Sequence, residues 1–204
     1  MELDHLVVAA GDLEQAVAHS EEALGVRLLS GGQHARFGTH NRLLGFDGRD
    51  YFEAIAANPD APDPGRPRWF GLDGLSGPAR LVTWVCRVAD LEAALAIWPQ
   101  AGEVHELERG ALRWRMAVPA DGALHFGGVM PLLIEWQGDL HPSDQLETKG
   151  CRLQSLSLFS PDAEEVKDLL GRLGLSDPRV RITGAPQVAL EAMIETPAGL
   201  RRLK

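Results

Sequence analysis

The sequence has few of the features that mark secreted, membrane-spanning or metal-scaffold proteins. Its two cysteines, Cys86 and Cys151, are too few and too far apart for a disulfide framework or a zinc knuckle, so we expect two free thiols. No apolar run reaches the roughly 18 residues of a membrane-spanning helix, and the N-terminus has no basic segment followed by an apolar stretch. We therefore expect neither a transmembrane helix nor a signal peptide, and a cytoplasmic location.

Positive charge is also scarce. The 204 residues include 20 Lys and Arg against 29 Asp and Glu, which gives a net charge of −9 and a pI near 5.2. Binding to phosphates requires clustered Lys and Arg, so this balance disfavours nucleic acid or an anionic membrane as a partner. With 45% hydrophobic residues and a mean hydropathy of −0.11, the chain is expected to form one domain over residues 1–204 that binds a small molecule.

One short pattern occurs twice in the chain and a third time in weaker form. It consists of an apolar strand, an Asp at the position of a helix N-cap, and an alanine-rich helix. The copies are LDHLVVAAGDLEQAVAHSEEALG at 3–25, RLVTWVCRVADLEAALAIW at 80–98 and RLQSLSLFSPDAEEVKDLLGRLG at 152–174. Because a single copy cannot bury its own apolar face, the fold must come from pairing the copies.

Short segments bounded by Gly, Pro or Asp follow each copy and are typical of strands. Residues 1–57 and 80–137 are thus each predicted to form a strand, a helix and three strands, and 151–204 a shorter version that extends or closes the sheet. The connection 58–79 is rich in Pro and Gly but contains Trp69-Phe70. Two adjacent aromatics favour a loop that folds over something apolar, either as a lid on a pocket or as a link pinned to the outer helices.

The series GGQHARFGTHNRLLGF, YFEAIA, LRWRMAV, GGVMPLLIEW and HPSD resembles the glyoxalase-like domain of the vicinal oxygen chelate superfamily. The resemblance covers nearly the whole chain. It implies an α+β fold in which repeated βαβββ units form a cupped mixed sheet around a ligand or metal, with helices packed outside. It does not specify a reaction, because the superfamily includes isomerases, dioxygenases, transferases and proteins that only bind a drug.

The repeat also suggests which residues share a site. His5 lies seven residues before Asp12, as Thr83 does before Asp90, and Gln154 has the equivalent place in the third copy. The resemblance implies that such first-strand residues carry a metal together with a carboxylate from the last strand, where Glu53 and Glu135 stand. A divalent cation held by His5, Glu53, Glu135 and Gln154 is thus one expectation, with Glu53 or Glu135 moving a proton.

A buried carboxylate costs several kcal/mol unless it is paired, protonated or bound to a cation. The alternative to a metal is therefore that each glutamate pairs with an arginine such as Arg42, Arg113 or Arg115, and that His5 is a core histidine. Thr83 removes the second histidine on which ring-cleaving dioxygenases of the superfamily depend, so that reaction is not expected.

Other polar and aromatic residues are expected to contact the ligand. His34, Thr39 and Asn41 place hydrogen-bonding groups between two strands, next to Gly31 and Gly32, which allow a close approach of backbone. The alternative is a polar hairpin whose side chains only satisfy the turn. Trp114, Pro131 and Trp136 are expected to form apolar walls of the pocket. His141 is a histidine that matches the family.

Two functions from different classes remain open. The first is metal-assisted lyase, isomerase or hydrolase chemistry on a small carbonyl compound. The second is metal-free binding of a small molecule, as in drug-sequestering, bleomycin-resistance-like proteins. The units could pair across a homodimer or within one chain.

Overall fold

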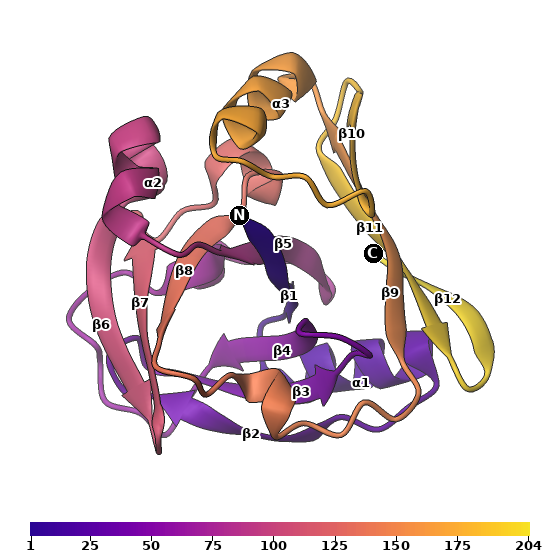
Figure 1. Cartoon of the computed structure of the whole chain (residues 1–204). Coiled ribbons are helices and arrows are strands. Elements are labelled where there is room, and N and C mark those ends of the chain that lie inside the picture. The colour runs from indigo at the N-terminus through magenta and orange to yellow at the C-terminus, as the bar shows by residue number, and fades with distance from the viewer.

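The computed structural model describes residues 1–204 and contains two β-sheets and three α-helices (Figure 1). The first unit comprises β1 (Glu2–Ala9), α1 (Leu13–Leu24), β2 (Leu29–His34), β3 (Thr39–Gly45) and β4 (Tyr51–Ala57). The second comprises β5 (Arg80–Arg87), α2 (Leu91–Ile97), β6 (Glu103–Arg109), β7 (Leu112–Val118) and β8 (Leu132–Gln137). The third comprises β9 (Arg152–Ser160), α3 (Ala163–Arg172), β10 (Val180–Gly184), β11 (Ala189–Thr196) and β12 (Gly199–Leu203). Short 3-10 turns are η1 (Trp69–Gly74), η2 (Pro99–Ala101), η3 (His125–Gly128) and η4 (Pro142–Asp144).

The first two units join into one eight-stranded sheet of order β2-β3-β4-β1-β5-β8-β7-β6. Their first strands, β1 and β5, pair antiparallel at the centre, and each pairs in parallel with the last strand of its own unit. The edge strands β2 and β6 contact each other, so the sheet curls into a cup. The expected α+β architecture with a cupped mixed sheet is thereby confirmed.

Helices α1 and α2 begin where the repeated Asp was expected to cap them. The Asp12 side chain accepts from the backbone N–H of Gln15, and Asp90 does the same for Ala93. These bonds satisfy N–H groups that have no partner within the helix. α1 ends at Gly25, whose φ of 70° is left-handed and favours glycine. None of the helices has the length and apolar character needed to cross a membrane.

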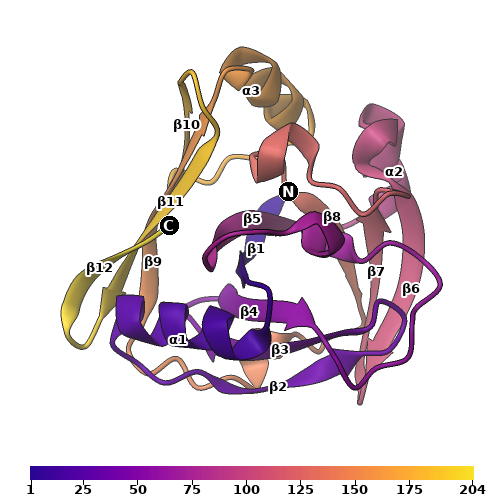
Figure 2. The same ribbon diagram turned by 180° about the vertical axis from the view of Figure 1, so that it is seen from behind.

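The third unit neither extends nor closes the cup, contrary to expectation. It forms a separate four-stranded sheet of order β10-β9-β11-β12, in which both edges of β9 are already occupied by strands of its own unit. In β9 the buried Leu156 and Leu158 alternate with the half-buried Ser155, Ser157 and Phe159, so one face of this sheet is apolar. That face packs onto the helix side of the large sheet, with β12 next to α1 (Figure 2).

Two apolar clusters divide the molecule into an outer and an inner core. The outer cluster lies between the back of the eight-stranded sheet, the helices and the third unit. The inner cluster fills the cup and includes Val7, Ile55, Val85, Trp114 and Ile134. Because strand side chains alternate between faces, apolar runs such as LVVA on β1 supply both clusters.

The connection 58–79 folds into the cup and not onto the outer helices. Trp69 and Phe70 are buried in the inner cluster, and the Trp69 indole stacks on Phe37 with ring centroids 4.3 Å apart. Phe70 has a φ of 58°, an unusual conformation for a bulky residue that its burial holds in place. The connection thus covers a pocket, which was the first of the two expectations for it.

Candidate functional site

His5 and Glu53 face each other inside the cup. β1 and β4 are adjacent and parallel, with Val7 opposite Glu53 and His5 opposite Tyr51. The Nε2 atom of His5 lies 3.5 Å from Oε2 of Glu53, and both side chains are almost fully buried. The prediction that these two residues lie on neighbouring strands and point to the same concave face is confirmed.

Asp4 completes this cluster and was not singled out from the sequence. The pairing of β1 with β5 shifts register between Leu3 and His5, and such irregularities commonly redirect a side chain. The Asp4 carboxylate is fully buried and lies 2.7 Å from Nδ1 of His5 and 3.0 Å from Nε2 of His141. It also accepts a 2.9 Å hydrogen bond from the indole N–H of Trp136.

Burial alone would favour the uncharged forms of these side chains, but their mutual hydrogen bonds favour the charged forms more strongly. Burial lowers the pKa of His5, whereas its bonds to Asp4 and Glu53 raise that pKa to about 9. Burial raises the pKa of Asp4 and of Glu53, yet the hydrogen bonds from histidine lower both below their ordinary values. At neutral pH the cup therefore holds an imidazolium between two carboxylates.

His34, Thr39 and Asn41 also reach the site. The amide of Asn41 donates to Oε1 of Glu53, while its carbonyl oxygen accepts from the backbone N–H of Gly32 at 2.7 Å. A Cβ on Gly31 would come within 2.1 Å of Asn41, so glycine is required there for this approach. Asn41 thus orients the carboxylate of Glu53.

Thr39 determines the protonation pattern of His34. Its hydroxyl oxygen accepts a 3.2 Å hydrogen bond from the Trp69 indole, so the hydroxyl proton is free to donate to Nδ1 of His34, 3.0 Å away. Burial lowers the pKa of His34 to about 4, which keeps the ring neutral. With Nδ1 accepting from Thr39, the ring proton is on Nε2, which has no hydrogen-bond partner in the protein, and His34 is one of the residues that line the cavity.

The cavity next to these residues is small and largely aromatic. It measures about 30 Å³, enough for one or two waters, and Trp69, Phe70, Trp114 and Trp136 form its walls. The predicted wall residues Trp114 and Trp136 are thus placed there. Pro131 is buried ahead of β8 but does not line this cavity.

Glu135 lies on the other side of the sheet. Its carboxylate accepts a 2.7 Å hydrogen bond from the backbone N–H of Leu91 at the start of α2 and lies 3.4 Å from Arg115. It forms an acidic group there with Asp90, which caps α2, and Glu92, which pairs with Arg115. Of the arginines considered as alternative partners, Arg115 is therefore the one that Glu135 uses.

Gln154 is equally remote, because it belongs to the separate third-unit sheet. It is exposed and donates to Glu195 at 2.7 Å. The hydroxyl of Thr83 donates to the backbone carbonyl of Gly128. Neither residue can join His5 in one coordination sphere.

Only two of the four residues expected to hold a metal, His5 and Glu53, meet in the cup, and this set does not fit a catalytic zinc site. His5 Nε2 and Glu53 Oε2 are two donors, whereas catalytic zinc sites generally use three protein ligands. The only group of three or more closely spaced candidate metal-ligating side chains is the outer Asp90, Glu92 and Glu135. Both polar atoms of the Asn41 amide are engaged by Gly32 and Glu53.

Sequence reasoning missed Asp4, Tyr51 and Arg109. Asp4 had a signal, since a charged residue in an otherwise apolar strand requires a partner. Tyr51 stacks on His5 with ring centroids 4.4 Å apart. Arg109 lines the cavity from the end of β6, where the alternating charges of EVHELER resemble an ordinary solvated strand.

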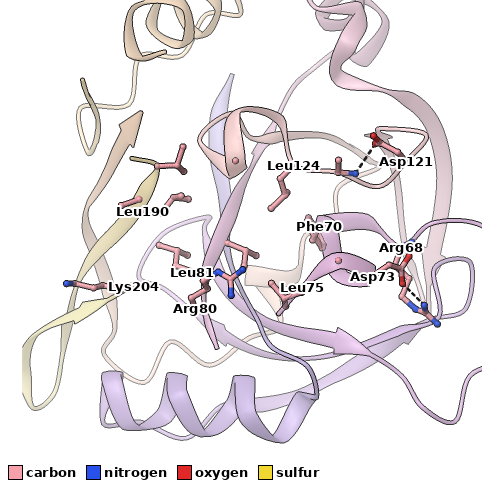
Figure 3. A pocket seen from close by; sticks show the side chains of 17 residues that line it. Arg68, Phe70, Asp73, Leu75, Arg80, Leu81, Asp121, Leu124, Leu190 and Lys204 are labelled. Atoms are coloured by element: carbon pink, nitrogen blue, oxygen red, sulfur yellow. Dashed lines mark hydrogen bonds and ion pairs between the residues drawn. The ribbon is translucent and has the colours of Figure 1, made fainter. Parts of the chain in front are cut away.

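A larger hollow of about 590 Å³ lies outside the cup, between η1, the start of β5 and β11 (Figure 3). Its floor is apolar, formed by residues such as Leu81, Leu124 and Leu190. Its Arg68 and Asp73 pair with each other at 2.6 Å. It contains no histidine, and Phe70 separates it from the cavity at His5.

A family model described as a glyoxalase-like domain matches residues 3–174. The chain belongs to the glyoxalase-like domain family. This places it in the vicinal oxygen chelate superfamily and accounts for the two βαβββ units that form the cup. Among proteins of curated function, none matches this glyoxalase-like protein.

Solved structures with this fold include a hypothetical protein from Staphylococcus aureus. It is 13% identical with a TM-score of 0.65, and the match covers 100% of this chain and 98% of that one. Methylmalonyl-CoA epimerase of Streptomyces coelicolor has 17% identity over 69% of this chain and 96% of its own, with a TM-score of 0.43. The methylmalonyl-CoA epimerase of Mycobacterium tuberculosis has 21% identity over 68% of this chain and 89% of its own, with a TM-score of 0.41.

Proposed function

We propose that this glyoxalase-like protein is a metal-independent enzyme that moves a proton on a small carbonyl compound bound in the cup. The cavity of about 30 Å³ holds only one or two waters, so binding requires Trp69 and Phe70 of the covering connection 58–79 to move aside. The observation that carries the proposal is the buried pair of Glu53 and His5 beside the cavity. Glu53 is ionised and can accept a proton, whereas His5 holds one and can donate a hydrogen bond.

In the proposed reaction Glu53 removes a proton from the carbon next to the carbonyl. The electron pair of the broken C–H bond moves onto the carbonyl oxygen, where the Nε2–H of His5 stabilises the negative charge. Return of the proton from Glu53 to a different position or face of the enolate gives an isomer, so the step needs no further reactant. Asp4 holds the His5 ring through Nδ1 and keeps it charged.

The test is hydrogen exchange at the carbon next to the carbonyl, followed by proton NMR in D₂O with dihydroxyacetone, methylglyoxal and pyruvate. We expect the wild type to accelerate loss of the C–H signal for at least one probe. Glu53→Gln retains the shape of the side chain and its bond to Asn41, so it should abolish exchange while the circular dichroism spectrum is unchanged. Glu135→Gln is the matched control and should exchange as the wild type does.

Exchange that survives in Glu53→Gln contradicts the proposed role of Glu53. Exchange that disappears after chelator treatment and returns with a divalent metal contradicts the metal-independent part. Emission spectrometry of the purified protein measures the metal directly.

A second candidate function, metal-free binding without turnover, is favoured by the aromatic walls of the cavity. It predicts that probes quench the tryptophan fluorescence of the wild type and of Glu53→Gln equally, and that neither protein catalyses exchange. For either function we propose a cytoplasmic location. We also propose that the protein forms a homodimer, which light scattering can test.

A further inference from the structure

We propose that the ligand of the cup carries a carboxylate, bound between the guanidinium of Arg109 and the Nε2–H of His34. This inference rests on the proposed function and names its substrate class: small oxo acids, in which a carbonyl and a carboxylate are joined by a short chain.

Arg109 reaches the cavity because of a glycine on the opposite edge strand. It ends β6 and crosses to β2, where its side chain lies against Gly32. A Cβ on Gly32 would come within 2.4 Å of the Arg109 Cδ. Glycine in a strand often marks such a close approach. The Gly31-Gly32 pair thus admits two residues to the site, Asn41 and Arg109.

The guanidinium of Arg109 has no acidic partner, in contrast to the arginines next to it on the sheet. Arg113 lies 3.0 Å from Glu108, and Arg115 pairs with Glu92. Arg109 has no carboxylate within 4.0 Å and no hydrogen bond, although it is half-buried and lines the cavity. A half-buried guanidinium with five unused donors is suited to bind a carboxylate through two parallel hydrogen bonds.

The acids around the cavity have their partners within their own cluster. Asp4 and Glu53 both hydrogen-bond with His5, and Arg87, 3.9 Å from Asp4, forms its closer ion pair with Glu2 at 2.6 Å. None of these carboxylates lies within 4.0 Å of Arg109, so its guanidinium has no ion-pair partner in the protein.

His34 supplies a neutral donor on the same side of the cup. Its Nδ1 is engaged by Thr39, and its ring meets the indoles of Trp69 and Trp114 edge to face. The Nε2–H therefore has no partner in the protein, and His34 lines the cavity. Arg109 and His34 would hold the carboxylate, which leaves the rest of a short ligand beside Glu53 and His5.

The experiment measures binding of matched acid and neutral probes by quenching of tryptophan fluorescence at fixed ionic strength. The pairs are pyruvate with methyl pyruvate, and 2-oxobutyrate with 2-oxobutyramide. We expect the wild type to bind each acid at least tenfold more tightly than its neutral partner. Arg109→Gln should remove this preference and leave affinity for the neutral probe within twofold. Arg113→Gln, which removes a nearby arginine outside the cavity, should behave as the wild type.

Equal affinity for acid and neutral probes, an acid preference that survives in Arg109→Gln, or no binding of either acid overturns the inference. The exchange assay separates this failure from failure of the proposed function. Exchange on neutral carbonyls with no acid preference would leave proton transfer standing without the anion site. Selective binding of acids without exchange would leave the anion site and remove proton transfer.

Discussion

The two halves of the eight-stranded sheet share one topology but differ in what they place inside the cup. Asp90 lies 78 residues after Asp12, and by the same interval Val85 corresponds to Val7. Val7 pairs with Glu53, whereas Val85 pairs with Leu132. The counterpart of Glu53 is therefore an aliphatic residue.

This difference shows how a duplicated scaffold can hold a single polar site. The first half contributes the charged cluster and the amide that orients it. The second contributes apolar walls such as Trp114 and Ile134, and only Arg109 and the indole N–H of Trp136 as polar groups from its strands. Buried charges are tolerated in the first half because each has a partner. The second half has no such network, so its apolar side chains exclude water and strengthen the electrostatic interactions beside them.

The largest effect that distinguishes the halves should come from Asp4→Ala. It removes the acceptor for His5, His141 and Trp136, and breaking a buried ionic network by deleting one partner costs about 3–5 kcal/mol. Urea unfolding followed by circular dichroism measures the loss. Asp90→Ala, which removes an exposed helix cap in the second half, should cost about 1 kcal/mol. Equal losses would show that the buried polar cluster contributes no more to the free energy of unfolding than an exposed helix cap does.

An intermediate effect should appear when stability is measured against pH. His5 has a folded pKa raised from 6.5 to about 9, so its contribution is complete below pH 6.5 and is lost as the pH rises to 9. This rise corresponds to roughly 3 kcal/mol at most. His34 has a folded pKa lowered to about 4, so its contribution is present above pH 6.5 and is lost as the pH falls.

Stability should therefore have a maximum near pH 6.5. Urea midpoints across the range from pH 4 to pH 10 measure both limbs, and NMR titration of the histidine ring protons gives the two pKa values directly. His5→Gln should flatten the alkaline limb and His34→Gln the acidic one. An unchanged alkaline limb in His5→Gln would show that another group causes it.

The smallest effect should come from Glu135→Gln in the second half. The amide can still accept from the backbone of Leu91, so the loss is the charge at the start of α2 and its 3.4 Å ion pair with Arg115, which keeps Glu92 as a partner. Such a charge contributes about 0.3–1 kcal/mol, so the urea midpoint should shift little. Binding of the oxo-acid probes should match the wild type. A large loss of binding would place Glu135 functionally in the cup and contradict the comparison.

Much of the fold could be predicted from the sequence, because its signals are local. Asp12 and Asp90 indicated two helix starts, Gly25 indicated a helix end, and the repeat indicated the pairing of two units. The role of the third unit could not be predicted in this way. Its apolar strands are equally compatible with joining the large sheet or covering it, and occupation of both edges of β9 decides between them.

For the site, residue types were more predictable than partners. His5, Glu53, His34 and Asn41 were expected in the cup and lie there. Glu135 was taken as the equivalent of Glu53 because both stand late in a last strand. It lies three residues beyond the true counterpart, Leu132, and an odd displacement along a strand reverses the face.

The sequence by itself determined the duplication, the helix boundaries and the presence of a histidine and a glutamate in apolar strands that must find partners. Only the tertiary structure decided which partners they found. Strand register brings Glu53 to His5 and sends Glu135 to α2, the irregularity at Asp4 directs its carboxylate to His5 and His141, and contact between the edge strands brings Arg109 across Gly32. Each is a contact between residues distant in sequence, and short-range periodicity carries no information about register or sheet closure.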